Sequence, residues 1–124
     1  TPFCAINLMD DEAAARQPAR ENLALYIGGM GARDKNFYND YAKRLGHEGA
    51  AVEIQDHFLA GRRAEALASV PDELIDQVAL TGPAGKITER LQDWKSAAKD
   101  NKVHSLLARV SSSQELRVLA KAVL

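Results

Sequence analysis

The stretch of this sequence whose residue types most suggest binding chemistry covers residues 26–37 and reads YIGGMGARDKNF. Three glycines fall within four positions, and Arg33 and Lys35 follow them with cations that a phosphate would attract. The stretch fits neither the P-loop pattern nor GxGxxG, and it follows an expected helix, whereas both motifs need a preceding strand. Residue types alone therefore favour a helix terminator over a phosphate loop, and they leave the excess of glycine and the charged pair unexplained.

The histidines, the single cysteine and the serines offer no nucleophile or metal site. His47 and His57 do not share the i, i+4 face that a helical metal pair requires, so no metal is expected. Cys4 lies in an apolar run without a charged neighbour, which predicts an inert buried thiol. Ser111 follows an expected strand as a helix cap would, although the carboxyl ends of strands also face the active site of a barrel. We therefore expect no catalytic residue within this chain.

The composition is that of an ordinary folded protein. Of the 124 residues, 46% are hydrophobic and 27% are charged, and 16 Lys and Arg against 17 Asp and Glu give a net charge of -1. Without a basic excess, nucleic acid is not an expected partner. A lone cysteine excludes an internal disulfide and indicates a reducing compartment, so we expect a cytoplasmic protein. No apolar run reaches the roughly 18 to 20 residues that span a bilayer, so no membrane segment is expected.

Hydrophobic periodicity predicts many short helices and two strands in one domain. Each strand is a buried apolar run that a helix follows, which is typical of a parallel α/β sheet, and the first is already in progress where the sequence begins. Two strands alone do not make a sheet. Either the rest of the sheet lies upstream, or the strands pair in an oligomer, or the chain is all-helical with two extended segments. The expected elements are a strand over 1–9, a helical insertion over 11–80, a helix over 83–99, a strand over 103–110 and a helix over 113–124.

Individual residues mark where these helices begin and end. Pro18 is expected to break or kink the first helix, and Gly46 and Gly61 each stand where a left-handed C-terminal cap is needed. Ser112 and Glu115 form a capping box for the last helix. The apolar stripe expected on that helix is Leu116, Leu119, Ala120 and Val123.

Four features, read together and in order, resemble the C-terminal part of the luciferase-like monooxygenase family, in its deazaflavin-dependent branch. They are the YIGGMG turn before Asn36, the IQD helix before Gly61, the VPDEL segment, and a Gly-Pro pair before the helix that carries Trp94. The resemblance covers nearly the whole chain. One departure is the segment KDNK at residues 99–102, where family members commonly have an Ala-Gly turn.

The resemblance implies an α/β fold that is the C-terminal portion of a (β/α)8 TIM barrel, mostly helical in this chain with two strands. Residues 1–9 would be the seventh strand of the barrel and 103–110 the eighth, with 11–80 as an insertion between them. A whole barrel takes about 250 residues, so this chain would be a fragment of a longer protein without turnover of its own. The residues credited with catalysis in the family lie in earlier strands.

The family further implies an oxidoreductase or monooxygenase that moves a hydride between coenzyme F-420, or FMN in other branches, and a small organic substrate. The coenzyme would bind at the C-terminal mouth of the barrel, and a homo-oligomer is expected. The candidates for cofactor or substrate contact near that mouth are Asn7, Met30, Gly31, Arg33, Lys35, Asn36, Phe37 and Ser111. The alternative function is a non-enzymatic helical domain that uses exposed apolar stripes for interaction or oligomerisation.

Overall fold

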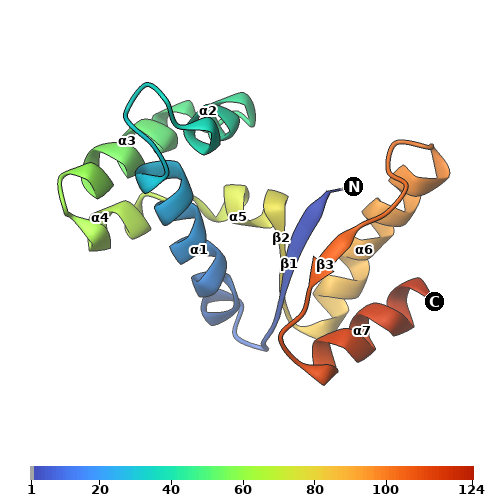
Figure 1. Ribbon diagram of the computed structural model, residues 1–124. Helices are drawn as coiled ribbons and strands as arrows, with labels where there is room; N and C mark the ends of the chain where they lie inside the picture. The colour runs from blue at the N-terminus through green and yellow to red at the C-terminus, as the bar shows by residue number, and fades with distance from the viewer. Residues whose placement is uncertain (1) are drawn as a thin grey trace. The chain divides into compact units, whose positions relative to one another are not determined.

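The computed structural model describes residues 2–124, which form two compact units. The first unit joins the residues up to Arg16 with Val78–Leu124, and the second unit is Gln17–Gln77. The first unit contains β1 (Phe3–Leu8), β2 (Ala79–Gly82), α6 (Ala84–Lys99), β3 (Leu107–Arg109) and α7 (Ser113–Val123). α1 (Glu12–Gly29) begins there and continues into the second unit, which also holds α2 (Phe37–Arg44), α3 (Glu48–Leu59), α4 (Arg63–Ala68) and α5 (Asp72–Val78) (Figure 1).

The sheet has three parallel strands in the order β2-β1-β3 (Figure 1). Ala5 of the central strand lies opposite both Ala79 of β2 and Arg109 of β3. The mixed α/β class is therefore confirmed, but the expectation of two strands is wrong. Residues 79–82 directly follow a helix and continue its apolar character, so they resemble more helix in the sequence, whereas pairing with β1 makes them extended.

β3 is shorter than the strand expected over 103–110. α6 ends at Lys99, and Asn101 then takes a left-handed conformation with φ of 57°, where a helix end usually has glycine. Regular pairing starts only at Leu107, whose N–H donates to the carbonyl of Pro2 at 2.9 Å. The KDNK segment thus replaces the glycine turn of the family with an asparagine turn.

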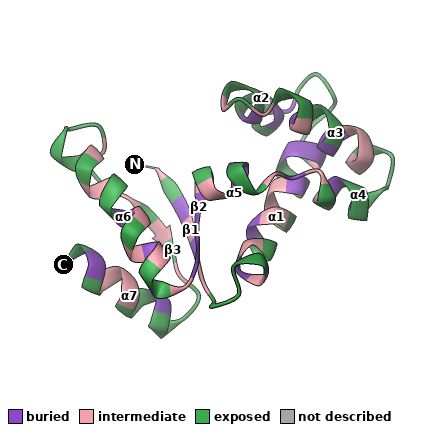
Figure 2. Ribbon diagram, turned by 180° about the vertical axis from the view of Figure 1, so that it is seen from behind, coloured by how far each residue is buried: buried purple, intermediate pink, exposed green. Residues whose placement is uncertain are grey.

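One apolar core lies between the sheet and the helices α6 and α7. Side chains alternate along β1, so Cys4 and Ile6 point into this core while Phe3, Ala5 and Asn7 point to the other face. Figure 2 shows the buried residues that run along β1 and β2. Both helices therefore cover the same face of the sheet. The buried members of this core are Cys4, Ile6, Leu80, Ile87, Leu91 and Ala122.

The buried face of α7 differs from the stripe that the sequence suggests. Leu116 and Val123 are largely exposed. The residues that pack toward the sheet are Val118, Leu119, Ala122 and the buried Glu115. The expected stripe is right at Leu119 and wrong at Leu116 and Val123, because the buried face of the helix includes Glu115, whose carboxylate finds hydrogen-bond partners outside its own helix.

The second unit is helical. α1 passes through Pro18 as one helix, so the expected break does not occur, because a proline removes only one backbone hydrogen bond and the helix continues on both sides. Gly46 (φ 96°) and Gly61 (φ 81°) take the left-handed conformation after α2 and α3, as expected. Arg20 ties α1 to the start of α5 through the carboxylate of Asp72. The buried apolar residues of this unit include Ile27, Ala51, Ile54, Val70, Leu74 and Ile75.

Candidate functional site

The glycines of the stretch 26–37 make room for a phenylalanine. A Cβ added at Gly28 would lie 2.5 Å from Cβ of Phe58, and one added at Gly29 would lie 2.3 Å from Cε1 of the same side chain. A Cβ at Gly31 would lie 2.5 Å from the carbonyl oxygen of Lys35. These distances are far below van der Waals contact, so only glycine lets α1 and α3 approach this closely. The excess of glycine that the sequence left unexplained is therefore a packing requirement.

Asn36 joins the end of α1 to the start of α2. Its Nδ2 donates to the carbonyls of Tyr26 and Ile27, both at 3.0 Å, and its Oδ1 accepts from the N–H of Asn39 at 3.0 Å. Asn39 donates in turn to the carbonyls of Ile27 at 3.2 Å and Ala51 at 2.8 Å. Both asparagines are buried. Because both amide hydrogens of Asn36 are engaged with the backbone, this side chain holds the loop in shape.

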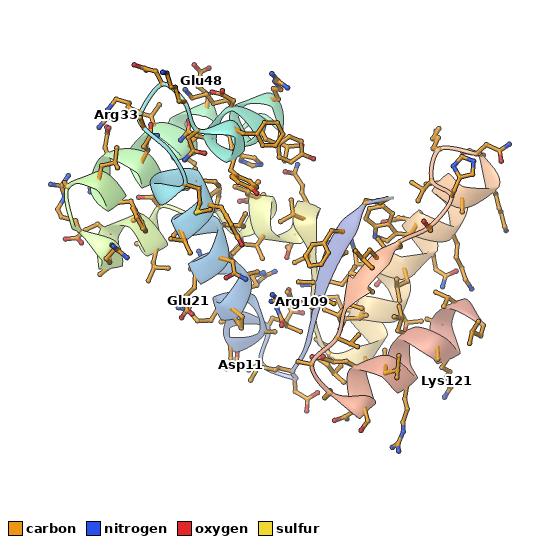
Figure 3. The ribbon with its side chains drawn as sticks, viewed as in Figure 1. Asp11, Glu21, Arg33, Glu48, Arg109 and Lys121 are labelled. Atoms are coloured by element: carbon orange, nitrogen blue, oxygen red, sulfur yellow. The ribbon has the colours of Figure 1, made fainter. Side chains whose placement is uncertain are left out.

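The two cations of the stretch differ in their surroundings. Arg33 lies on the loop between α1 and α2 (Figure 3) and forms an ion pair with Asp56 of α3 at the surface. Lys35 is exposed and forms no ion pair within residues 2–124. Of these two cations, only Lys35 has no ion-pair partner in the described second unit.

Exposed aromatic side chains gather beside the same loop. We call them the aromatic patch, and its members are Tyr26, Phe37, Tyr38 and Tyr41. Phe37 stacks on Tyr41 with ring centroids 6.4 Å apart and meets Tyr38 edge-on at 5.7 Å, while Tyr38 lies 4.8 Å from Tyr26. Phe37 is the most exposed of the four, at 69%, and Met30 nearby in sequence is exposed as well. The patch contains all three tyrosines of the sequence and offers an apolar surface to a ligand or a partner.

Asn7 lies near the carboxyl end of β1, on the face of the sheet opposite to α6 and α7. Its partner in register is Thr81 of β2, so the two side chains are neighbours on that face. Thr81 is only 3% exposed, yet its Oγ1 has no hydrogen-bond partner within residues 2–124, which is unusual for a buried hydroxyl. Thr81 was not among the expected site residues because the segment before it resembles the end of a helix. Its position directly before Gly82 and Pro83 was the only signal in the sequence.

Ser111 follows β3 and binds a buried carboxylate. Its N–H and its hydroxyl donate to Oε2 of Glu115 at 2.6 and 2.9 Å, and Oε1 of Glu115 accepts from the N–H of Leu8 at 3.1 Å. Burial alone would raise the pKa of Glu115, but the hydrogen bonds from Ser111 and Leu8 outweigh it and hold the pKa below its ordinary value. The hydroxyl hydrogen of Ser111 is therefore already engaged within the protein.

The thiol and the histidines make ordinary structural contacts. Burial raises the pKa of the Cys4 thiol, in keeping with an inert side chain. Nε2 of His47 lies 2.9 Å from Oε1 of Gln77, and Nδ1 of His57 accepts from Nε of Arg62 at 3.0 Å. Within residues 2–124, no group of three His, Cys, Asp or Glu side chains is arranged to hold a metal ion. None of the described helices combines the length and the apolar character of a membrane-spanning segment.

The predicted site residues fall into two groups, one in each unit. Asn7 and Ser111 lie at the carboxyl ends of β1 and β3 in the first unit, where Glu115 binds the backbone of both segments. The residues of the second unit are Met30, Gly31, Arg33, Lys35, Asn36 and Phe37, which lie along one loop and the start of α2.

Comparisons with known proteins identify the family. The family model of the luciferase-like monooxygenases matches residues 2–101. A Mycobacterium tuberculosis protein described as a coenzyme F-420-dependent oxidoreductase is 34% identical over 116 residues, which make up 94% of this chain and 32% of the relative. The chain thus spans about a third of that relative's length. No solved structure gave a significant match. Because the family model covers most of the chain and the relative is similar along nearly all of it, the chain belongs to the luciferase-like monooxygenase family.

Proposed function

We propose that this chain is the carboxyl-terminal part of a (β/α)8 barrel in an oxidoreductase that uses coenzyme F-420. The observation that carries the proposal is the extent of the similarity, which runs along 94% of this chain but only 32% of the F-420-dependent relative. The rest of such a protein would contain the earlier strands of the barrel and the residues that perform the reaction. The chain alone would then have no turnover.

The sheet supports the barrel because its two faces differ in what covers them. α6 and α7 pack on the face that holds Ile6 and Leu80, as the outer helices of a barrel do. On the opposite face, the cross-strand neighbours Phe3 and Leu107 are 58% and 59% exposed. Parallel sheets are normally buried on both faces, so this pair marks where further side chains of a barrel would pack. β1 and β3 would be the seventh and eighth strands, and β2 occupies the edge of β1 along which the sixth strand of a barrel would lie.

The carboxyl end of the sheet fits the polar edge of a ring cofactor. Thr81 has a buried hydroxyl without a partner in the described chain, and Asn7 beside it offers an amide that both donates and accepts. Bound F-420, or FMN as the alternative, would supply the hydride chemistry. Asn7 and Thr81 would orient the ring through hydrogen bonds, at the end of the strands where barrel enzymes have their sites.

The loop of the second unit supplies separate candidates for contact with the substrate, argued from that unit alone. Met30, Lys35 and Phe37 are exposed, so they are free to contact a small organic substrate. Arg33 is a weaker candidate because Asp56 already neutralises it. Gly31 and Asn36 would act by shaping the loop, through the close approach to a carbonyl and the backbone hydrogen bonds.

A chimera tests the proposed function. In it, this chain replaces the matching segment of the mycobacterial relative, and binding of F-420 and of FMN is followed by fluorescence. We expect the chimera to bind F-420 and to transfer hydride with a panel of small organic donors and acceptors, whereas the chain alone does neither. A folded chimera that binds neither coenzyme, or a chain that binds F-420 equally well alone, would contradict the proposal.

The aromatic patch favours a second candidate function, which is self-association as a non-enzymatic helical domain. Tyrosine and phenylalanine are enriched at the centres of protein interfaces, and Asp40 and Lys43 on α2 provide opposite charges that could pair across a two-fold contact. The double substitution Phe37→Ser and Tyr41→Ser should convert an oligomer into a monomer in sedimentation experiments. Val52→Ser, at another exposed apolar position, should not change the mass. A native chain that sediments as a monomer would exclude this function.

A further inference from the structure

Glu115 is the only carboxylic acid among residues 2–124 whose residue is buried, at 5% exposed. It lies in the first turn of α7, and its own N–H donates to Oγ of Ser112 at 3.1 Å, which fixes the start of the helix. In a full capping box the carboxylate would return to the N–H of the capping residue. Here the carboxylate interacts with the N–H of Ser112 and also binds Leu8 of β1 and Ser111 after β3.

The register of β1 and β3 defines which backbone hydrogen bonds would form if the two strands continued to pair beyond Arg109. The carbonyl of Pro2 accepts from the N–H of Leu107, and the pairing runs on to Ala5 opposite Arg109. Continued by two residues, a parallel ladder would join the N–H of Ser111 to the carbonyl of Ile6, and the N–H of Leu8 to the carbonyl of Ser111.

The carboxylate of Glu115 stands where this next part of the ladder would form. Oε1 accepts from the N–H of Leu8 at 3.1 Å, and Oε2 accepts from the N–H of Ser111 at 2.6 Å. Each oxygen therefore takes one of the two N–H groups that the continued ladder would have used. The hydroxyl of Ser111 adds a third bond at 2.9 Å. At Leu8 and Ser111, the side chain of Glu115 therefore bridges the two strands, whose backbones do not pair directly there.

We propose that Glu115 is a positioning residue whose carboxylate holds the carboxyl ends of β1 and β3 apart at a fixed separation. Its consequence for ligands, that it sets the places of Asn7 and Ser111 at the mouth of a barrel, rests on the proposed function. The separation of the strand ends itself does not depend on that function.

The chemistry of the site requires a carboxylate of this length. Both oxygens of an ionised carboxylate accept hydrogen bonds, and charge makes bonds to backbone N–H groups stronger than neutral ones. A glutamine keeps one accepting oxygen but turns an NH₂ group toward an N–H. An aspartate is one methylene shorter, so it would not reach both strands from the same helix position.

The arrangement can be tested directly on the native chain. In protein labelled with ¹⁵N and ¹³C, scalar couplings across hydrogen bonds reveal which carbon bears each accepting oxygen. We expect couplings from the amide nitrogens of both Leu8 and Ser111 to the side-chain carboxyl carbon of Glu115. Couplings from Leu8 to the backbone carbonyl of Ser111, and from Ser111 to that of Ile6, would show a continued ladder and overturn the proposal.

Variants then test whether the carboxylate sets the strand ends. In Glu115→Ala, hydrogen exchange at the amides of Leu8 and Ser111 should accelerate by at least about tenfold, while exchange at the amide of Ile6 changes by less than about twofold. Glu115→Gln should restore protection at one of the two amides, because one accepting oxygen remains. The matched control is Glu89→Gln, at an exposed position of α6, which should leave all these amides unchanged.

Two outcomes of the variant experiment count against the proposal. One is unchanged protection of Leu8 and Ser111 in Glu115→Ala, and the other is an equal loss of protection at Ile6, which would indicate general loosening. If Glu115→Ala fails to fold, the couplings in the native chain decide. Neither measurement uses a coenzyme, so a failure of the chimera to bind F-420 and a failure of this inference remain distinguishable.

Discussion

Gly28 and Phe58 form a contact in which the absence of a side chain is the essential property. Gly28→Ala places a Cβ 2.5 Å from Cβ of Phe58, close to the backbone of α3, where the neighbour has little freedom to move. Overpacking of this kind costs about 1 to 3 kcal/mol, which exceeds the gain of about 0.5 to 1 kcal/mol in helix propensity over most of that range. We expect a lower free energy of unfolding for Gly28→Ala, measured by urea denaturation.

Gly49 provides the matched control for that substitution. It also lies in a helix, α3, but a Cβ added there has no atom within 4 Å. Gly49→Ala should therefore stabilise the chain by about 0.5 to 1 kcal/mol. If both alanine variants changed stability in the same direction, close packing would not be the reason for the glycine at position 28.

The lowered pKa of Glu115 predicts how the free energy of unfolding depends on pH. Its pKa in the folded chain lies below the ordinary value of 4.5, so folding favours the ionised carboxylate. Its contribution to the free energy of unfolding is therefore complete above about pH 4.5 and is lost as the pH falls through the lowered folded pKa. At pH 7, Glu115→Gln should be less stable than the native chain by about 2 kcal/mol in urea unfolding. The difference should shrink in acid, and a constant difference would argue against this assignment.

At the scale of single residues, the sequence predicted the roles that depend only on residues nearby in the chain. Gly46 and Gly61 end helices in the left-handed conformation, and Ser112 caps α7, because each of these roles is decided within one turn. The partner of Gly28 and the partner of Glu115 lie far away in the chain. No local sequence pattern indicates that Phe58 would contact Gly28 or that Leu8 would contact Glu115, so neither contact could be predicted.

At the scale of elements, α2 depends on Asn36. Asn36→Ala removes the cap of α2 and leaves the carbonyl of Tyr26 and the buried carbonyl of Ile27 without these donors. The expected loss is about 2 to 4 kcal/mol in the free energy of unfolding, with fast hydrogen exchange in α2 as its local sign. Lys35→Ala, one residue earlier and exposed, should stay within about 0.5 kcal/mol of the native chain. Equal effects of the two variants would contradict the capping role.

The elements also show where sequence patterns stop being informative. α6 (Ala84–Lys99) follows a regular helical pattern, since Ile87 and Leu91 lie one turn apart and both face the core. β2 was missed because its four residues are apolar and follow a helix without a break, and only the edge of β1 makes them a strand. A short segment takes its conformation from its partner when its own pattern fits both states.

At the scale of the whole molecule, the exposed pair Phe3 and Leu107 provides a test of whether the chain stands alone or belongs to a barrel. In the chain by itself, Leu107→Ser should cost less than about 1 kcal/mol, because the side chain is 59% exposed. In the chimera, where a barrel interior would cover it, the same change should cost about 2 to 4 kcal/mol. Urea unfolding of both proteins gives the comparison, and an equally small cost in both would mean that nothing packs on this face.

The family could be identified from the sequence, since the order of the motifs along the chain indicated it and the comparisons confirm it. The candidate site could be predicted only in part from the sequence. The sequence named Asn7 from its place in a strand, but it gave no sign of Thr81, whose unpartnered hydroxyl depends on a register that only the folded sheet defines.

The position of β1 in the centre of the sheet has a consequence for the order of events during synthesis. Its two hydrogen-bonded neighbours, β2 and β3, both follow the entire second unit in the chain. The helical segment Gln17–Gln77 can therefore fold on local contacts before β2 and β3 have been made, and this three-stranded sheet closes only after Arg109 has left the ribosome. Until then the backbone N–H and C=O groups along β1 lack the partners that β2 and β3 provide, so a chaperone that covers exposed strands would act on β1 at this stage.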